Sequence, residues 1–155
     1  MARYGEAEKV VFTAASVGVR MDPNARTQTF FDMHDEDIIS LDIHPNKKIA
    51  ATGQMAAKGK TKVVEIYVWD IATKSVLACL KGFHLRAVGV LAFSPNGKYL
   101  LSVGRDNDNS LAIYDWANNN RIVATSKVDK SKVTCGVWKS NSQFVTCGLK
   151  HIKFW

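Results

Sequence analysis

The stretch from Gly53 to Thr61 contains glycine, lysine and threonine, the residue types with which phosphate-binding loops hold nucleotides. Such a loop needs four residues between its first glycine and the Gly-Lys pair, but five residues separate Gly53 from Gly59. A helix must also begin directly after the loop, whereas residues 63–69 are β-branched and aromatic and indicate a strand. The sequence therefore predicts a basic hairpin loop that carries Lys58, Lys60 and Lys62.

The Asp- and Asn-rich stretch 106–109 resembles the opening of a calcium-binding loop. That loop requires glycine at its sixth position and glutamate at its twelfth. Leu111 and Ala117 stand at these positions here. Asp and Asn side chains also form turns by hydrogen bonding to nearby backbone groups, so we expect a turn between two strands.

The acidic cluster 35–37 adjoins His34, and carboxylates beside a histidine are residue types of general acid–base catalysis. The cluster falls at the start of a predicted strand, so we interpret it as a solvated loop. Cys147 and His151 lack the further partners that a zinc site needs, and no nucleophile has both a base and an orienting group. We predict no catalytic, metal-binding or cofactor-binding residues, and a protein that is not an enzyme.

Length and composition indicate one folded domain of the soluble type. The chain has 155 residues, of which 46% are hydrophobic and 23% are charged. No apolar run approaches the roughly 20 residues that span a bilayer, and the first residues show no secretory signal. The three cysteines are expected to be free thiols buried in a reducing compartment: Cys79, Cys135 and Cys147.

The net charge of +7 is unevenly distributed along the chain. Residues 1–42 contain four basic and eight acidic residues, a net of −4, and residues 43–155 contain seventeen basic and six acidic residues, a net of +11. This asymmetry favours a polyanionic partner. A nucleic acid, an acidic membrane leaflet and an acidic protein polymer share that chemistry, and a basic surface without a specific partner is the other interpretation.

An internal repeat positions these residues. Residues 37–53, 87–104 and 132–148 each show alternating apolar positions, a turn that contains Asn, and a second apolar strand that ends at glycine. The first two turns also contain Pro. A third strand follows each copy, and its aromatic residues, Trp69, Tyr114 and Trp155, are 45 and 41 residues apart. Residues 74–83 and 121–128 add a fourth strand to the first two copies.

Four short strands at this period, with Trp-Asp ending the third strand of the first copy, are typical of a WD40 β-propeller blade. We predict an all-β, WD40-type β-propeller segment of two complete four-stranded blades flanked by two incomplete blades. Residues 8–33 would end a preceding blade whose first strand is missing. The blades that follow would be residues 34–83, residues 84–128, and residues 129–155, which lack a fourth strand.

Several polar and aromatic residues fit the structural network of such repeats, in which a histidine ties a loop to a Ser or Thr and to the aromatic residue. Thr52 and Trp69 are positioned to serve His34 in the first copy. In the second copy Ser102 is positioned to serve His84, but tyrosine replaces tryptophan. We predict structural roles for His34, Thr52, Trp69, His84, Ser102, Tyr114 and Trp155.

The segments in the first third of the chain resemble the first propeller of the echinoderm microtubule-associated protein-like family. The resemblance rests on the strands 10–12 and 15–17, on Thr27-Gln28-Thr29, on the stretch 34–38, on Ile43-His44-Pro45 and on Ala51-Thr52-Gly53-Gln54, and it extends to residues 111–116 and 146–155. Members of that family bind microtubules and tubulin through paired propellers. The resemblance implies a cytoplasmic, microtubule-associated interaction module.

Two functional hypotheses follow. In the first, the chain belongs to a microtubule-associated protein and docks basic loops onto the acidic surface of tubulin, through Lys47, Lys48, Lys58, Lys60 and Lys62. In the second, it is a generic WD40 scaffold that binds a peptide or protein and has no microtubule role. Both expect a protein partner and no nucleic acid or membrane. The remaining blades would come from a longer parent chain or another copy, because open blade ends expose unpaired edges.

Overall fold

The computed structural model describes residues 1–56 and 63–155, which fold into β-strands and one short 3-10 helix, η1 (Glu6–Glu8). The first sheet contains β1 (Ala2–Tyr4), β2 (Val10–Ala14), β3 (Val17–Asp22) and β4 (Thr27–Phe31), and the second contains β5 (Ile38–Ile43), β6 (Ile49–Gln54), β7 (Glu65–Asp70) and β8 (Val76–Lys81). The third contains β9 (Val88–Phe93), β10 (Tyr99–Gly104), β11 (Ser110–Asp115) and β12 (Arg121–Lys127), and the fourth contains β13 (Val133–Trp138), β14 (Phe144–Gly148) and β15 (His151–Phe154). The predicted all-β class is confirmed.

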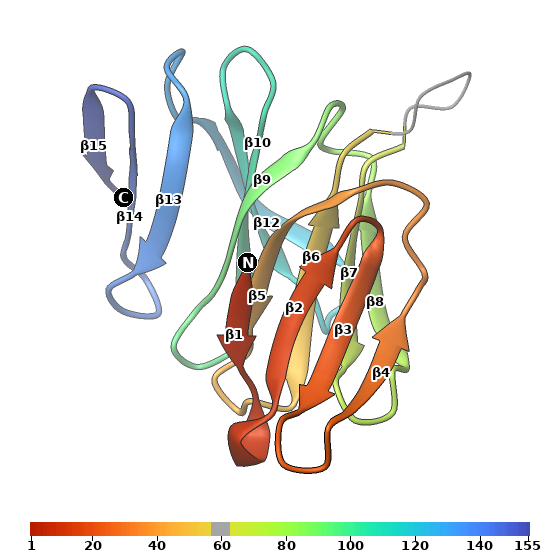
Figure 1. Cartoon of the computed structure of the whole chain (residues 1–155). Helices are drawn as coiled ribbons and strands as arrows, with labels where there is room; N and C mark the ends of the chain where they lie inside the picture. The colour runs from red at the N-terminus through yellow and green to blue at the C-terminus, as the bar shows by residue number, and fades with distance from the viewer. Residues whose placement is uncertain (57–62) are drawn as a thin grey trace.

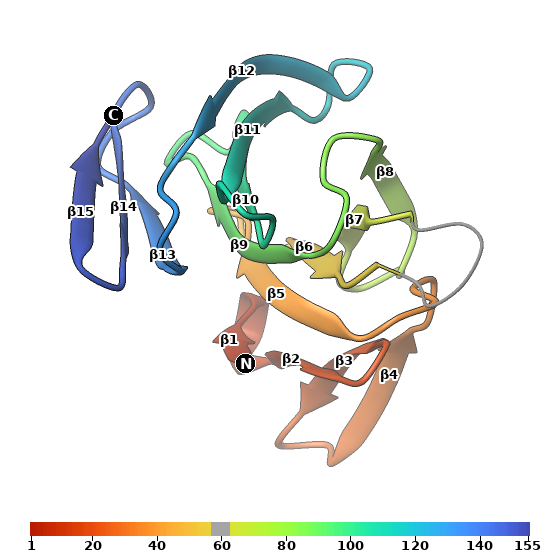
Figure 2. The ribbon, with the colours of Figure 1, turned by 90° about the horizontal axis from the view of Figure 1, so that it is seen from above.

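Each sheet is antiparallel, and its strands pair in chain order, as short turns between neighbours require (Figure 1). Seen from above, β1, β5, β9 and β13 gather toward the middle, and β4, β8, β12 and β15 point outward (Figure 2). The sheets are therefore successive sectors about a common axis. This is the arrangement that stacked blades adopt.

The first sheet corrects one prediction, because its first strand is present. β1 pairs with β2 in the register Ala2↔Phe12 and Tyr4↔Val10. β1 has only three residues, all of them exposed, so it lacks the alternation of apolar and polar positions by which a strand is predicted. The tight connection between β1 and β2 is closed by the Gly5 N–H, which donates to the Lys9 carbonyl at 2.8 Å.

The first turns of the second and third sheets are built alike. Each has one residue in the left-handed region that closes the hairpin: Lys47, with φ of 60°, between β5 and β6, and Gly97, with φ of 72°, between β9 and β10. Their N–H groups donate at 2.8 Å to the carbonyls of His44 and Ser94. Glycine adopts this conformation without strain, whereas the lysine does so at a cost.

The apolar core lies between the sheets rather than within one of them. Val11, Phe31 and Trp69 share a cluster between the first and second sheets. Val68, Leu80, Val88 and Leu100 belong to a cluster between the second and third sheets, and Val103, Leu111 and Phe144 to one between the third and fourth. Each large side chain buried in this way contributes about 1.5–3 kcal/mol, so neighbouring sheets stabilise one another.

The two outermost faces remain uncovered. Phe30 of the first sheet is 55% exposed, and Ile152 and Phe154 of the fourth are 61% and 77% exposed. Apolar side chains this open are unusual at a finished protein surface when they lie next to one another. Within the described residues, no helix has the length and apolar character needed to cross a membrane.

Candidate interaction surface

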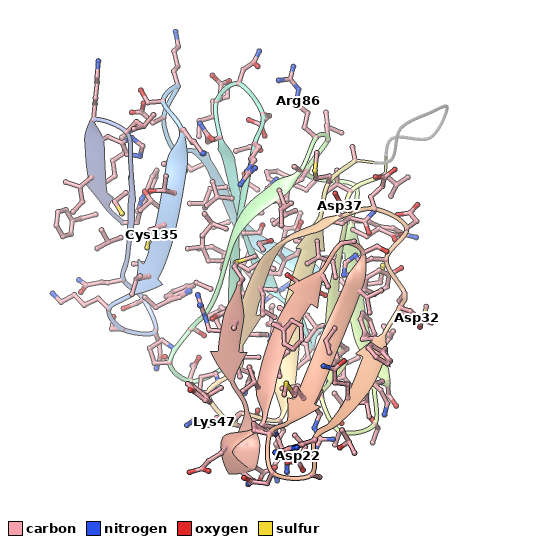
Figure 3. All side chains as sticks on the ribbon, in the orientation of Figure 1. Asp22, Asp32, Asp37, Lys47, Arg86 and Cys135 are labelled. Carbon is pink, nitrogen blue, oxygen red and sulfur yellow. The ribbon has the colours of Figure 1, made fainter. Side chains whose placement is uncertain are left out.

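Lys47 and Lys48 lie in the turn between β5 and β6, at the lower end of the sheets, where Figure 3 labels Lys47 and Asp22. Their backbone is held firmly: the Lys47 carbonyl accepts from the Glu6 N–H at 3.0 Å, and the Lys48 carbonyl accepts from the Ile71 N–H at 2.9 Å. Lys48 Nζ is 3.8 Å from Glu6 Oε1. Both side chains are largely exposed, so this ion pair is weak and Lys48 stays available to a partner.

The other three predicted contact residues, Lys58, Lys60 and Lys62, lie outside the described residues. Ala56, just before them, donates its N–H to the Arg86 carbonyl at 2.6 Å. Lys48 precedes β6 and Ala56 follows it, so the six residues of this strand separate them, which is about 20 Å at 3.3 Å per residue. Lys47 and Lys48 therefore lie at the end of the sheet opposite Ala56.

The predicted partners of His34 form one buried chain of hydrogen bonds. The Trp69 indole N–H donates to Thr52 Oγ1 at 3.2 Å, and Thr52 Oγ1 is 2.7 Å from His34 Nε2. His34 Nδ1 is 2.6 Å from Gln54 Oε1, and the Gln54 amide donates to Asp35 Oδ1 at 2.6 Å. The Gln54 oxygen can only accept, so His34 carries its proton on Nδ1 and accepts from the Thr52 hydroxyl at Nε2.

Trp69 anchors this hydrogen-bond network to the first sheet. Its side chain has no exposed surface and stacks on Phe31, with ring centroids 4.4 Å apart and an interplanar angle of 3°. Gly18 leaves room for the indole, because a Cβ at that position would lie 3.0 Å from a Trp69 ring carbon. Burial lowers the pKa of His34, although its bond to Gln54 opposes this. His34 is therefore a neutral structural residue at neutral pH.

The second copy has a shorter network. His84 Nε2 is 2.7 Å from Ser102 Oγ, and Ser102 Oγ also donates to the Ala112 carbonyl at 3.4 Å. His84 Nδ1 is buried and has no hydrogen-bond partner in the part of the chain that the structure describes. Burial lowers the pKa of His84 to about 4 and raises that of Tyr114 to about 12. Tyr114 is buried, but no hydrogen bond joins it to His84 or Ser102 within the described residues.

The third copy keeps only the aromatic half of the network. The Trp155 indole donates to Thr146 Oγ1 at 2.9 Å, and Trp155 stacks on Phe144 with centroids 5.8 Å apart. Asp129 stands four residues before Val133, the spacing that His34 and His84 have from the first strands of their own copies. Of the seven predicted network residues, Thr52, Trp69, Ser102 and Tyr114 lie within strands, whereas His34, His84 and Trp155 lie just outside them.

The acidic cluster and the cysteines differ in how closely they follow the sequence predictions. Asp35 accepts from Gln54 and so belongs to the edge of the His34 network, which makes that part of the cluster more than a solvated loop.

The expectation that all three thiols are buried is wrong. Cys135 is exposed on the open face of the fourth sheet, where Figure 3 labels it, and Cys79 and Cys147 are half-buried.

Sequence reasoning missed a basic surface at the upper end of the sheets. Arg86 follows β8, Arg105 follows β10, and Lys130 and Lys132 follow β12. These four residues line one hollow of about 400 Å³. Sequence reasoning missed this cluster because its four residues are far apart in the sequence. The signal that identifies it is their equivalent position in the repeat, since each lies in a connection at the same end of adjacent sheets.

Sheets packed in sequence about one axis, together with a buried His–Thr–Trp chain, define a segment of a WD40-type β-propeller. The fold agrees with that of a chain in the crystal structure of the mitotic checkpoint complex, with a TM-score of 0.80 over 100% of this chain and 45% of that chain at 18% identity. The chain belongs to the echinoderm microtubule-associated protein family: the family model described as the echinoderm microtubule-associated protein first beta-propeller matches residues 27–155.

Curated relatives agree with this assignment. Echinoderm microtubule-associated protein-like 2 from Mus musculus is 35% identical over 95% of this chain, and echinoderm microtubule-associated protein-like 1 from Rattus norvegicus is 30% identical over the same share. The chain spans 24% and 19% of the lengths of these two relatives. The match therefore concerns only a part of each relative.

Proposed function

We propose that the chain is part of a non-catalytic, cytoplasmic docking module that binds tubulin or microtubules. The observation that carries this proposal is the family match over residues 27–155, because the relatives are named as microtubule-associated proteins. The net charge of +11 over residues 43–155 supports it. Basic loops attract an acidic polymer and speed its encounter with the protein.

The sheets act as a rigid platform in this proposal. The buried hydrogen bonds from Trp69 to Gln54 fix β6 and β7 relative to one another. The connections before and after β6 both carry lysines. Lys58, Lys60 and Lys62, which lie outside the described residues, are one set of candidate contacts, and Lys47 and Lys48, in the turn before β6, are the other. We expect each set to contribute to binding separately.

The open faces fit a module completed by further blades. Phe30 on one face and Phe154 on the other are more than half exposed. This chain spans 24% and 19% of the lengths of the two curated relatives, so they are about four to five times as long. We expect the remaining blades of a longer parent chain to cover these faces, because a propeller closes with typically 4–8 blades.

Microtubule co-sedimentation tests the proposal. The wild-type chain is expected to pellet with microtubules at low salt and less at high salt, because exposed charges are screened. K58E/K60E/K62E and K47E/K48E, made separately, are expected to bind about three- to tenfold more weakly. The control variant K98E/K139E reverses two exposed lysines in other turns at the lower end.

Each outcome separates the alternatives. Loss of binding in only one lysine variant assigns docking to that end of the sheets. Equal binding by wild type, both lysine variants and the control removes these five lysines from the mechanism. A wild-type chain that never pellets with microtubules contradicts the docking role and favours the generic scaffold, whose partner a pull-down would identify.

A further inference from the structure

Four cations from three connections line the hollow at the upper end of the second and third sheets. Arg86, Arg105, Lys130 and Lys132 are all exposed. Figure 3 shows Arg86 at this upper end, away from Lys47 at the lower end. The hollow of about 400 Å³ therefore collects positive charge that the sequence spreads over 47 positions, from 86 to 132.

Among the residues that the structure describes, these cations have no acidic partner of their own. None of the four forms an ion pair within residues 1–56 and 63–155. Arg86 Nη1 donates to the side-chain oxygen of Asn107 at 2.9 Å, which orients the guanidinium but leaves its charge uncompensated. Full positive charge at an exposed hollow attracts an anionic partner.

The neighbouring acids are engaged elsewhere. Asp108 pairs with Lys127 at 2.8 Å, and Asp129 pairs with Lys153 at 3.3 Å. Asp106 accepts from the N–H of Asp108 and from Ser110, and although burial acts to raise its pKa, these hydrogen bonds hold it below the usual range. The acids therefore shape the turns, and the surplus charge at the hollow is positive.

The hollow is also preorganised. The Asn109 side chain is buried and donates to the carbonyls of Asp129 at 2.8 Å and Ser131 at 3.0 Å, which fixes the segment that carries both lysines. Arg105 lies over Gly89, where a Cβ would come within 2.8 Å of its Nε atom. A preorganised site loses less entropy when it binds.

We infer that this hollow binds an acidic polypeptide segment through Arg86, Arg105, Lys130 and Lys132. Arginine forks and lysine ammonium groups match carboxylates. Leu85, beside Arg86, is 67% exposed and offers an apolar contact that suits a peptide side chain. A nucleic acid fits less well, because Asp106 also lines the hollow and none of its lining residues is aromatic and able to stack on a base.

This inference deepens the proposed function, because it names a surface and the chemistry of the tubulin segment that the surface would hold. The test is fluorescence anisotropy with labelled decaglutamate at low salt. K130E/K132E is expected to weaken binding about tenfold or more, and R86A less. The matched control K98E/K139E makes the same change in net charge in the third and fourth sheets, which the segment with Lys130 and Lys132 connects, but at the other end of those sheets.

Thermal melting of every variant verifies the fold, and K130A/K132A replaces the charge reversal if that variant does not fold. Binding that falls in K130E/K132E and persists in K98E/K139E supports the site. The inference is overturned if wild type does not bind decaglutamate, if the control weakens binding equally, or if a ten-residue oligothymidylate binds more tightly and is lost in the same variant.

Microtubule co-sedimentation, run in parallel, separates this inference from the proposed function. A chain that pellets with microtubules but ignores decaglutamate keeps the proposed function and loses this site. A chain that binds decaglutamate through Lys130 and Lys132 but never pellets with microtubules keeps the site and loses the proposed function. A K130E/K132E variant that is weakened in both assays supports both.

Discussion

His34 and His84 occupy equivalent positions before the second and third sheets, yet their ring nitrogens meet different partners. Both bond through Nε2 to a hydroxyl, of Thr52 at 2.7 Å and of Ser102 at 2.7 Å. The Nδ1 of His34 donates to Gln54, whereas the Nδ1 of His84 is buried without a partner among the described residues. His34 therefore carries its proton on Nδ1. The Ser102 hydroxyl gives its only proton to the Ala112 carbonyl, so His84 donates to Ser102 and carries its proton on Nε2.

The last residue of the second strand in each copy explains this difference. Gly104 stands where the first copy has Gln54. A Cβ at Gly104 would come within 2.6 Å of His84 Nδ1 and 2.9 Å of Asp106 Oδ2, so the Asp106 turn excludes a glutamine there. Both copies therefore pair their strands in the same way. The loop after the second strand determines whether the buried histidine Nδ1 has a hydrogen-bond partner.

The largest difference between the two networks is expected at their aromatic residues. Trp69→Phe should lower the free energy of unfolding by about 2–3 kcal/mol, because it removes the bond to Thr52 and part of a fully buried ring. Tyr114→Phe should change it by less than about 0.5 kcal/mol, because no hydrogen bond to the Tyr114 hydroxyl is lost. Urea unfolding measures both. Equal losses in the free energy of unfolding would show that the two aromatic residues contribute equally to stability, which would contradict the comparison.

Acid should destabilise the protein more through His84 than through His34. The folded pKa of His84 is lowered to about 4 from 6.5, so between these values the unfolded chain binds more protons and stability rises with pH. The contribution of His84 is complete above pH 6.5, and roughly 2–3 kcal/mol of it is lost on acidification to about pH 4.5.

Unfolding of wild type and His84→Gln at pH 7 and pH 4.5 measures this contribution. His84→Gln is expected to flatten the pH dependence, although it lowers stability at pH 7. His34→Gln serves as the matched control and should flatten it less, because the bond to Gln54 opposes the effect of burial on the pKa of His34. A larger change in the His34 variant would reverse the comparison.

A side chain at position 104 should break the second network. Gly104→Ala is expected to cost about 1–3 kcal/mol, because the new methyl group must displace His84 or Asp106. Gly82 is the matched control for substitution by alanine, since nothing lies within 4 Å of a Cβ there and only the positive φ of 91° opposes it. Thermal unfolding should rank Gly104→Ala as the more damaging of the two, and the opposite ranking would contradict the crowding.

The smallest effect is expected when the first network is made to resemble the second. Gln54→Ala removes the partner of His34 Nδ1 and should cost about 1–2 kcal/mol. It should also make stability more sensitive to acid, because burial then acts on the pKa of His34 without an opposing bond. Urea unfolding at two pH values verifies both effects, and an unchanged pH dependence would exclude Gln54 from the electrostatics of His34.

Most of the fold follows from local patterns in the sequence. The alternating apolar positions, the turns around Pro45 and Pro95, and the recurring aromatic residue predict the strands and their order, because each strand is half-buried between neighbouring sheets. β1 escaped prediction because all three of its residues are exposed. The pairing of Gln54 with His34 also escaped, since it depends on two side chains 20 positions apart reaching the same buried point.

The charged surface was harder to predict than the fold. The predicted contact lysines lie in the connections before and after β6, and the six residues of that strand separate Lys48 from Ala56. The cations at the upper hollow are distant in sequence and meet only because β8, β10 and β12 end on the same side. In a protein built from repeated sheets, equivalent positions in the repeat therefore predict which charges cluster, whereas distance along the chain does not.

The burial of Trp69 also gives the molecule an optical reporter. Trp69 has no exposed surface, whereas Trp116, Trp138 and Trp155 are half-buried, so the blue edge of the tryptophan emission comes from Trp69. A hydroxyl alone lies between the indole and His34, and a protonated imidazole quenches a nearby indole. Fluorescence at the blue edge should therefore follow the protonation of His34. His84 has Tyr114, and no indole, in the corresponding place.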